Sequence, residues 1–191
     1  MAQTSALHPP VNSIDHVMGR ADAPITLVEY GDFQCPYCFR AHPLVMRLQQ
    51  RFGSRLRFVF RNFPLSELHP HAAHAAEAAE SVAAHAGEPA YWAMHHALFE
   101  HQQESDDALD DEHLLRYAAE AGADVSRVKA DLASDQYRIR VRSDFLSGVR
   151  SGVNGTPTFF INGVRFDGDW TDLEEFAYAL EGAVSVEAAG A

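Results

Sequence analysis

The chain contains two cysteines, Cys35 and Cys38, and only two residues separate them. A pair at this spacing that follows a strand and opens a helix is the setting expected of a redox dithiol. Pro36 suits the first position of a helix, where its missing N–H costs nothing, and this places Cys35 at or near the N-cap. The free N–H groups and the positive end of the helix dipole there favour a thiolate. We therefore predict a pKa for Cys35 below that of a free cysteine.

The spacing also predicts different roles for the two sulfurs. Cys35 would attack a partner disulfide, and Cys38, about one turn later and more buried, would resolve the mixed disulfide. Two other interpretations of the pair stay open. It could be half of a zinc site completed by His69, His71 or His74, or an inert pair of small core residues.

The elements around the pair predict a strand, a helix and a second strand. The segment Ile25–Gly31 is rich in β-forming residues and follows Pro24, which disfavours a helix just before it. Apolar side chains then repeat at helical spacing as far as Phe52, and Gly53 is a helix stop signal. Residues 56–63 alternate apolar and basic side chains and are predicted to form the second strand.

The middle of the chain predicts helices. Residues 70–147 are rich in Ala, Glu and His and contain few β-branched residues. Stop and start signals divide the segment into four or five helices. Their expected bounds are about 71–86, 89–103, 110–121, 125–133 and 135–149.

The end of the chain predicts a hairpin and one more helix. A strand is expected over 158–161, and Asn162-Gly163 is the signal for a tight turn into a partner strand at 164–167. The sequence Thr171-Asp172-Leu173-Glu174 resembles a capping box that opens a helix to about residue 183. Together, the order of elements predicts an α/β core interrupted by a helical insertion.

Composition and charge exclude several classes of protein. The chain has 191 residues, of which 47% are hydrophobic and 22% charged, as in ordinary globular proteins. The net charge of −12 argues against nucleic-acid binding, which needs a basic surface. No apolar run reaches the roughly 20 residues that span a bilayer. The first residues lack the features of a secretory signal, so we expect a cytoplasmic protein, while an exported form with its leader removed stays open.

Two segments carry a resemblance to a known family. GRADAPITLVEYGDFQCPYCFRAHP and VNGTPTFFING resemble the thioredoxin superfamily, and more closely its DsbA-like branch, across about residues 17–183. The resemblance implies an α/β thioredoxin-like fold with an inserted helical domain. The expected core is 15–64 plus 150–184 and the expected insertion is 65–149. Residues 1–14 and 185–191 are expected to be flexible ends.

Three further positions match the family's pattern. Glu29 lies six residues before Cys35, where the superfamily carries a buried acid in a strand. Pro43 lies eight residues after Cys35, at the position of a proline in the active-site helix of thioredoxins. Thr156-Pro157 precedes the late strand, where the resemblance implies a cis-proline.

These matches imply roles for individual residues. A buried carboxylate has a raised pKa, so Glu29 is expected to accept the proton of Cys38 during resolution. The residues expected to contact the substrate are Pro36, Tyr37, Thr156 and Pro157.

The resulting expectation is a thiol–disulfide oxidoreductase that exchanges a Cys35–Cys38 disulfide or dithiol with protein or peptide thiols and disulfides. It would need no separate cofactor and hold no metal. Pro-Tyr between the cysteines also occurs in glutaredoxins, so a glutathione-linked reductase or transferase acting on small thiols stays open. A redox-inactive metal-binding or scaffold module is the third hypothesis. We expect His69, His71, His74 and the pair His95-His96 to be solvated or partly packed on helices.

Overall fold

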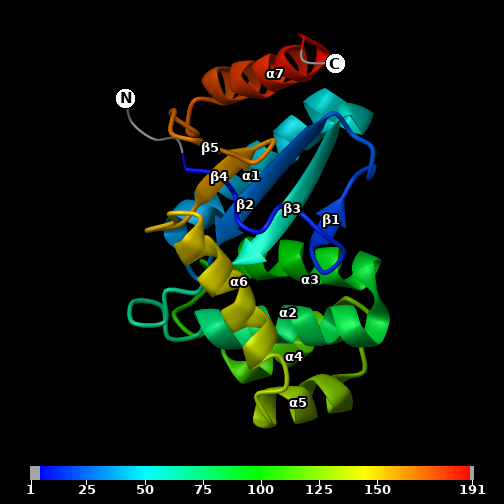
Figure 1. Cartoon of the computed structure of the whole chain (residues 1–191). Coiled ribbons are helices and arrows are strands. Elements are labelled where there is room, and N and C mark those ends of the chain that lie inside the picture. Colours follow the sequence, from blue (N-terminus) through cyan, green and yellow to red (C-terminus); the bar gives the residue numbers. More distant parts are fainter. Residues whose placement is uncertain (1–4, 190–191) are drawn as a thin grey trace.

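The computed structural model describes residues 5–189, with side chains through residue 184. A five-stranded sheet lies at its centre, in the order β1-β3-β2-β4-β5 (Figure 1). β2 pairs in parallel with β3 and antiparallel with β4, so this central strand joins segments from the two ends of the chain. The strands are β1 (His16–Met18), β2 (Ile25–Gly31), β3 (Leu56–Asn62), β4 (Thr158–Ile161) and β5 (Val164–Phe166).

The central strand β2 is buried along its whole length. Its side chains alternate between the two faces of the sheet. Ile25 and Leu27 belong to one apolar cluster, whereas Val28 and Tyr30 belong to another on the opposite face. A nearly continuous apolar strand therefore supplies both cores, as expected of a strand covered on both sides.

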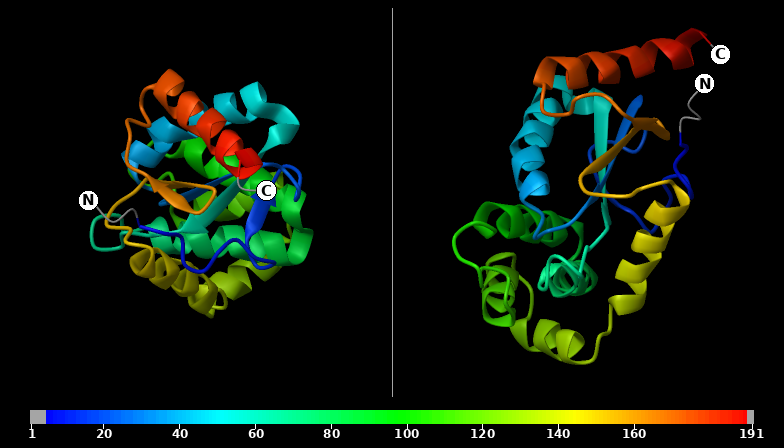
Figure 2. Two further views of the ribbon diagram at one scale, coloured as in Figure 1. Left: turned by 45° about the horizontal axis from the view of Figure 1, so that its top comes forward. Right: turned by 90° about the vertical axis from the view of Figure 1, so that its left-hand side faces the viewer.

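Helices and a terminal segment cover the sheet (Figure 2). α1 (Pro36–Phe52) and α7 (Leu173–Ala189) contact each other and pack on one face. On the other face lie α6 (Arg138–Arg150) and the segment before β1, through Phe145 and Leu7. Among residues 5–189, no helix combines the length and the apolar character needed to cross a membrane.

Five helices connect β3 to β4, which confirms the predicted helical segment to within about three residues at each end. α2 lies at the centre and contacts the other four. Its buried alanines, such as Ala75 and Ala79, have small side chains that let the neighbouring helices come close. The apolar cluster of the sheet continues into these helices, with the Phe58 and Trp92 rings 5.7 Å apart. The helices are α2 (Ala72–Ala86), α3 (Glu88–His101), α4 (Asp111–Glu120), α5 (Val125–Ala133) and α6.

Two local predictions that position the candidate site are confirmed. Cys35 is the N-cap of α1, and Pro36 occupies its first turn, while Pro43 lies inside the helix. The β4–β5 hairpin turns at Asn162 and Gly163, whose φ angles are 46° and 82°. Both values are positive, as a type I′ turn requires.

The N-terminal segment differs from the prediction of a flexible end over 1–14. Residues 1–4 lie outside the described residues, but Leu7 is buried and Ala6 pairs with Val164 of β5. The reason is Arg61, a buried cation on β3. Its guanidinium binds Asp15 and the carbonyl oxygens of residues 9 and 10. A buried charge must be paired and hydrogen-bonded, so this side chain holds the segment against the sheet. The short strand β1, which the sequence did not predict, follows it.

The C-terminal helix also differs from its prediction. α7 continues to Ala189 rather than ending near residue 183, because no proline or C-terminal glycine stop follows Gly182 before that point. Most of the segment predicted as a flexible end is therefore helical, and residues 190–191 lie outside the described residues. The carboxylate of Asp172 accepts hydrogen bonds from the N–H groups of Glu174 and Glu175. Asp172, and not Thr171, caps this helix.

Candidate active site

Cys35 and Cys38 lie together where the loop after β2 enters α1. Both are free cysteines and both are buried. The Cys35 thiol donates a hydrogen bond to the carbonyl oxygen of Thr156 over 3.4 Å. The backbone N–H of Asp32 points at the Cys38 sulfur, 3.5 Å away. Loops on both sides of the sulfur pair therefore fix its position.

The structure gives the two thiols opposite acidities. The pKa of Cys35 falls to about 6, first because it accepts a hydrogen bond from the Cys38 thiol and further because of the N–H groups of Cys38 and Tyr37. Burial raises the pKa of Cys38, and its hydrogen bond to Cys35 raises it further. The thiolate is the nucleophile in disulfide exchange. Cys35 is thus the thiol that ionises more readily, and Cys38 is the one that keeps its proton.

Glu29 lies in β2 on the same side of the sheet as the sulfur pair. It is only 2% exposed, and its neighbours in the sheet register are Phe60 and Phe159. Burial raises its pKa to about 8, and the nearby charge of Cys35 adds to the shift, whereas a hydrogen bond with Cys38 opposes it. One carboxyl oxygen, Oε1, has no hydrogen-bond partner among the described residues. Glu29 can therefore exchange a proton near neutral pH, next to the thiol that must lose one.

The glycine that ends β2 makes room for this carboxyl group. A Cβ atom at Gly31 would come within 2.4 Å of the Phe60 ring and 3.1 Å of Glu29 Oε1. Phe60 and Glu29 could not keep their positions beside a larger residue. No local pattern in the sequence indicates this role for Gly31.

The residues expected to contact the substrate surround Cys35. Pro36 and Tyr37 are exposed, and 56% of Tyr37 is accessible to solvent. Thr156 and Pro157 are partly buried, and the peptide bond between them is cis. The structure therefore brings Thr156 to the cysteine from 121 residues away and leaves Pro36 and Tyr37 on the surface next to it.

Two polar residues at the site were not predicted. Asp32, in the loop after β2, is fully buried and accepts hydrogen bonds from the N–H of Leu65 and from His69 Nδ1, the latter over 2.7 Å. Gln102, at the end of α3, donates to the carbonyl oxygens of Phe33 and Cys35. These bonds tie the redox loop, residues 32–35 between β2 and α1, to the segment after β3 and to the inserted helices. No local sequence signal marks Gln102, whose partners lie far away in the chain.

The zinc interpretation of the cysteines gains no support from the described residues. His69 binds Asp32, and His74 binds Asp111. Within residues 5–189, the convergent group of possible metal ligands consists of His42, His95 and His96 and includes neither cysteine.

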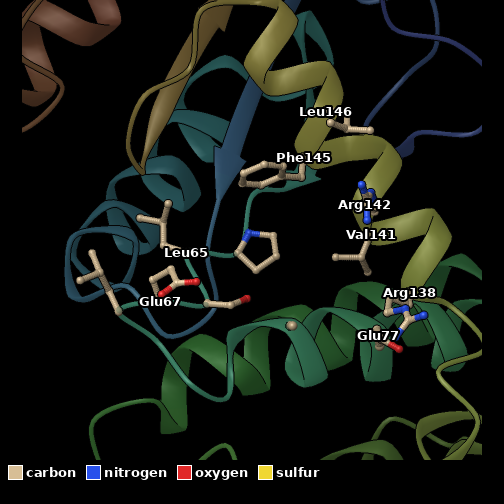
Figure 3. A pocket seen from close by; sticks show the side chains of 12 residues that line it. Leu65, Glu67, Glu77, Arg138, Val141, Arg142, Phe145 and Leu146 are labelled. Atoms are coloured by element: carbon tan, nitrogen blue, oxygen red, sulfur yellow. The ribbon is translucent and has the colours of Figure 1, made fainter.

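A cavity of about 570 Å³ lies beside the segment that Asp32 holds (Figure 3). Its walls come from residues 64–68, α2 and α6. Leu65, Val141 and Phe145 give it an apolar surface, and Glu67 and Arg142 lie at its sides. Leu65 both lines the cavity and donates its N–H to Asp32, so the cavity is connected to the redox loop.

The sheet order, the cysteine pair at the start of α1 and the helices inserted between β3 and β4 define a thioredoxin fold with a helical insertion. The family described as thioredoxin matches residues 12–181. The chain belongs to this family.

Solved structures agree with this assignment of the fold. BdbD from Bacillus subtilis, in its oxidised form, has a TM-score of 0.83 and 24% identity, and the match covers 95% of this chain and 97% of that one. For alpha-DsbA1 of Wolbachia pipientis the TM-score is 0.76 at 20% identity, over 93% and 96% of the two chains. A thioredoxin-like oxidoreductase from Silicibacter pomeroyi DSS-3 has a TM-score of 0.68 and 27% identity, over 88% and 94%.

Curated relatives are similar in sequence but much longer. The Na⁺/H⁺ antiporter NhaA 1 of Mycolicibacterium vanbaalenii is 40% identical over 92% of this chain and 27% of its own length. The Na⁺/H⁺ antiporter NhaA 1 of Salinispora arenicola is 43% identical over 88% of this chain and 24% of its own length. The chain thus spans about a quarter of the curated relatives it matches, and their name belongs to those longer proteins.

Proposed function

We propose that the protein is a thiol–disulfide oxidoreductase whose redox centre is the Cys35–Cys38 pair itself, with no separate cofactor. The observation that carries this proposal is the opposite acidity of the two thiols beside a buried carboxyl group with a pKa of about 8. An inert pair of core cysteines would not need this arrangement.

The proposed reaction moves two electrons from the dithiol to a partner disulfide. The Cys35 thiolate attacks one partner sulfur, the partner S–S bond breaks, and a mixed disulfide forms. Glu29 then takes the proton of Cys38. The Cys38 thiolate attacks the Cys35 sulfur, the mixed disulfide breaks and the second partner thiol leaves. The reverse sequence oxidises a partner dithiol.

The substrate we propose is a protein or peptide. Tyr37 and Pro36 give Cys35 an exposed apolar border, and the cavity beside Leu65 can hold apolar side chains. Similar structures include a protein described as the thiol-disulfide exchange protein alpha-DsbA2 of Wolbachia pipientis. A small thiol would use little of this apolar surface.

The lowered pKa of Cys35 favours the oxidising direction, because a stabilised thiolate stabilises the reduced pair. Its value of about 6 lies between the values of about 7 for thioredoxin and about 3.5 for DsbA. We therefore expect a reduction potential between about −270 and −120 mV. Equilibration with glutathione buffers of known ratio measures it.

Cysteine variants test the whole proposal in an assay that follows disulfide formation in a reduced, unfolded protein. Cys35→Ser should abolish activity, by about 10⁴-fold or more given that the nucleophile itself is lost. The matched variant Cys38→Ser should keep the nucleophile and accumulate a mixed disulfide, visible by mass spectrometry. If Cys38→Ser instead turns over with glutathione, the protein acts on small thiols. A wild-type protein that forms no Cys35–Cys38 disulfide would refute the redox function.

A further inference from the structure

Three histidines face one another where α1 meets α3, one of the inserted helices. His42 lies on α1, and His95 and His96 are neighbours on α3. One ring nitrogen of each lies within 4.8 Å of those of the other two. His42 Nε2 and His96 Nδ1 are 3.3 Å apart, although 54 residues separate them in the sequence. The fold, and not a local motif, brings these rings together.

Other histidines of the inserted helices are arranged differently. His74, His85, His101 and His113 each place a ring nitrogen within hydrogen-bond distance of a carboxylate. The three convergent rings form no such bond with a carboxylate among the described residues. No hydrogen-bonded acid among the described residues holds them as cations, although Glu100 lies one turn after His96 on α3.

His95 is the least satisfied of the three. It is only 1% exposed, and neither of its ring nitrogens has a hydrogen-bond partner among the described residues. Its ring lies among aromatic side chains, with Phe60 at 4.7 Å and Trp92 at 5.1 Å between ring centroids. Leaving a buried polar group unpaired costs free energy of folding. A bound atom that pairs with these nitrogens would remove that cost.

We propose that His42, His95 and His96 form a binding site for a divalent transition metal ion of the zinc type. Imidazole is a preferred ligand of such ions, whereas calcium and magnesium prefer oxygen. Two nitrogens bound to one tetrahedral zinc at about 2.0–2.1 Å lie roughly 3.3 Å apart, as His42 and His96 already do. A ring nitrogen of His95 lies within 4.8 Å of the other two, and its ring would move toward them to bind the same ion.

The fourth ligand would come from solvent. His42 and His95 are buried, but His96 is partly exposed, so the remaining position opens on its side. Three histidines and a water molecule form a known type of zinc coordination.

Metal titration of the oxidised protein tests the site. A Cys35–Cys38 disulfide removes the thiolates as competing ligands, and the double variant Cys35→Ser/Cys38→Ser serves if no disulfide forms, so the test does not depend on the redox function. Zn²⁺ is titrated against a chromophoric chelator and Co²⁺ by its visible absorption. We expect one equivalent of metal, the absorption bands of tetrahedral Co²⁺, and a higher melting temperature.

Histidine variants locate the bound ion. His96→Ala, at the partly exposed ligand, should weaken zinc binding by about 100-fold, the upper effect of losing a supporting interaction at a metal site, and should remove the rise in melting temperature. The control His74→Ala, at an exposed histidine on α2, should bind as the wild type does. Less than half an equivalent of metal, or equal affinity in the wild type and His96→Ala, would overturn the proposal. If His96→Ala is unfolded, His42→Gln provides the same comparison.

Discussion

Glu29 and Glu80 are both buried glutamates, but the protein surrounds them in opposite ways. Glu29 has no cation beside it among the described residues, and one of its oxygens has no partner. Glu80, on α2, contacts His16 at 3.1 Å and Arg140 at 3.4 Å and accepts a hydrogen bond from Asn62. The first carboxyl group lies at the sulfur pair, and the second lies where the inserted helices meet the sheet.

The difference distinguishes a buried acid placed for chemistry, Glu29, from one placed to hold the structure together, Glu80. The partners of Glu80 come from β1, β3 and α6, so this network holds the insertion to the sheet. Asp144 belongs to it as well: burial raises its pKa to about 6, and the pairing with Arg140 limits the shift. Glu29 keeps a raised pKa because it is buried without a cation, and only a hydrogen bond with Cys38 opposes the shift. A buried acid with a cation stabilises the structure, whereas one without can move a proton.

The largest expected effect comes from removing Arg140, the cation that pairs with the buried carboxylates of Glu80 and Asp144. Arg140→Met should destabilise the protein by about 3–5 kcal/mol, because Glu80 and Asp144 would remain buried without their partner. Urea unfolding measures this change. The control is Arg138→Met, two residues away on α6, whose ion pair with Asp135 is exposed and should contribute only about 0–1 kcal/mol. Equal losses in the two variants would mean that the buried network does not hold the insertion.

The next largest effect is a change in the rate of the resolving step when Glu29 is replaced. Glu29→Gln should slow the resolving step by about 10²-fold, the usual contribution of a positioned proton acceptor, and should flatten its pH profile. Stopped-flow fluorescence with a peptide disulfide follows that step. Glu80→Gln should lose stability and keep the rate of resolution. If both variants resolve at the wild-type rate, Glu29 has no role in proton transfer.

The effect that is smallest per measured step, here one pH unit, is the pH dependence of stability, measured by urea unfolding of the oxidised protein. Glu29 has a pKa near 4.5 in the unfolded chain and about 8 in the folded one. Between these values the folded protein binds the proton and the unfolded chain does not, so stability should fall as pH rises, by up to about 1.4 kcal/mol per unit.

The oxidised form is needed because the reduced Cys35 works in the opposite direction. Its pKa is lowered to about 6, so its thiolate adds stability as pH rises through that value. In Glu29→Gln the fall in stability between about pH 6 and about pH 8 should disappear, whereas Asp144, whose pKa is raised to about 6, still contributes below that range. An equally steep fall in the variant would assign it to another group.

Local signals predicted most of the fold. The N-cap position of Cys35 follows from Pro36, the hairpin follows from Asn162-Gly163, and the helix bounds follow from stop and start residues. Each of these features depends on conformational preferences within a few residues. The sulfur pair belongs with them, because its chemistry depends on the start of one helix.

Features set by distant contacts could not be predicted in this way. β1 has three residues, and its His16 is fixed by Glu80 from another part of the chain. The segment before it is held by Arg61, which looked like one basic residue of an alternating strand. Asp32 and the three convergent histidines have the same origin: their partners are neighbours only in the folded protein.

The number of residues between Cys35 and Thr156 affects how the site forms while the protein is being synthesised. The 121 residues between them take roughly 6–24 s to synthesise at about 5–20 residues per second. During that time β2 has no β4 beside it, and Glu29 lacks the cover of Phe159. Until Thr156 is made, the Cys35 thiol lacks the carbonyl oxygen to which it donates a hydrogen bond. The redox centre is complete only when β4 joins the sheet, long after its two cysteines have been synthesised.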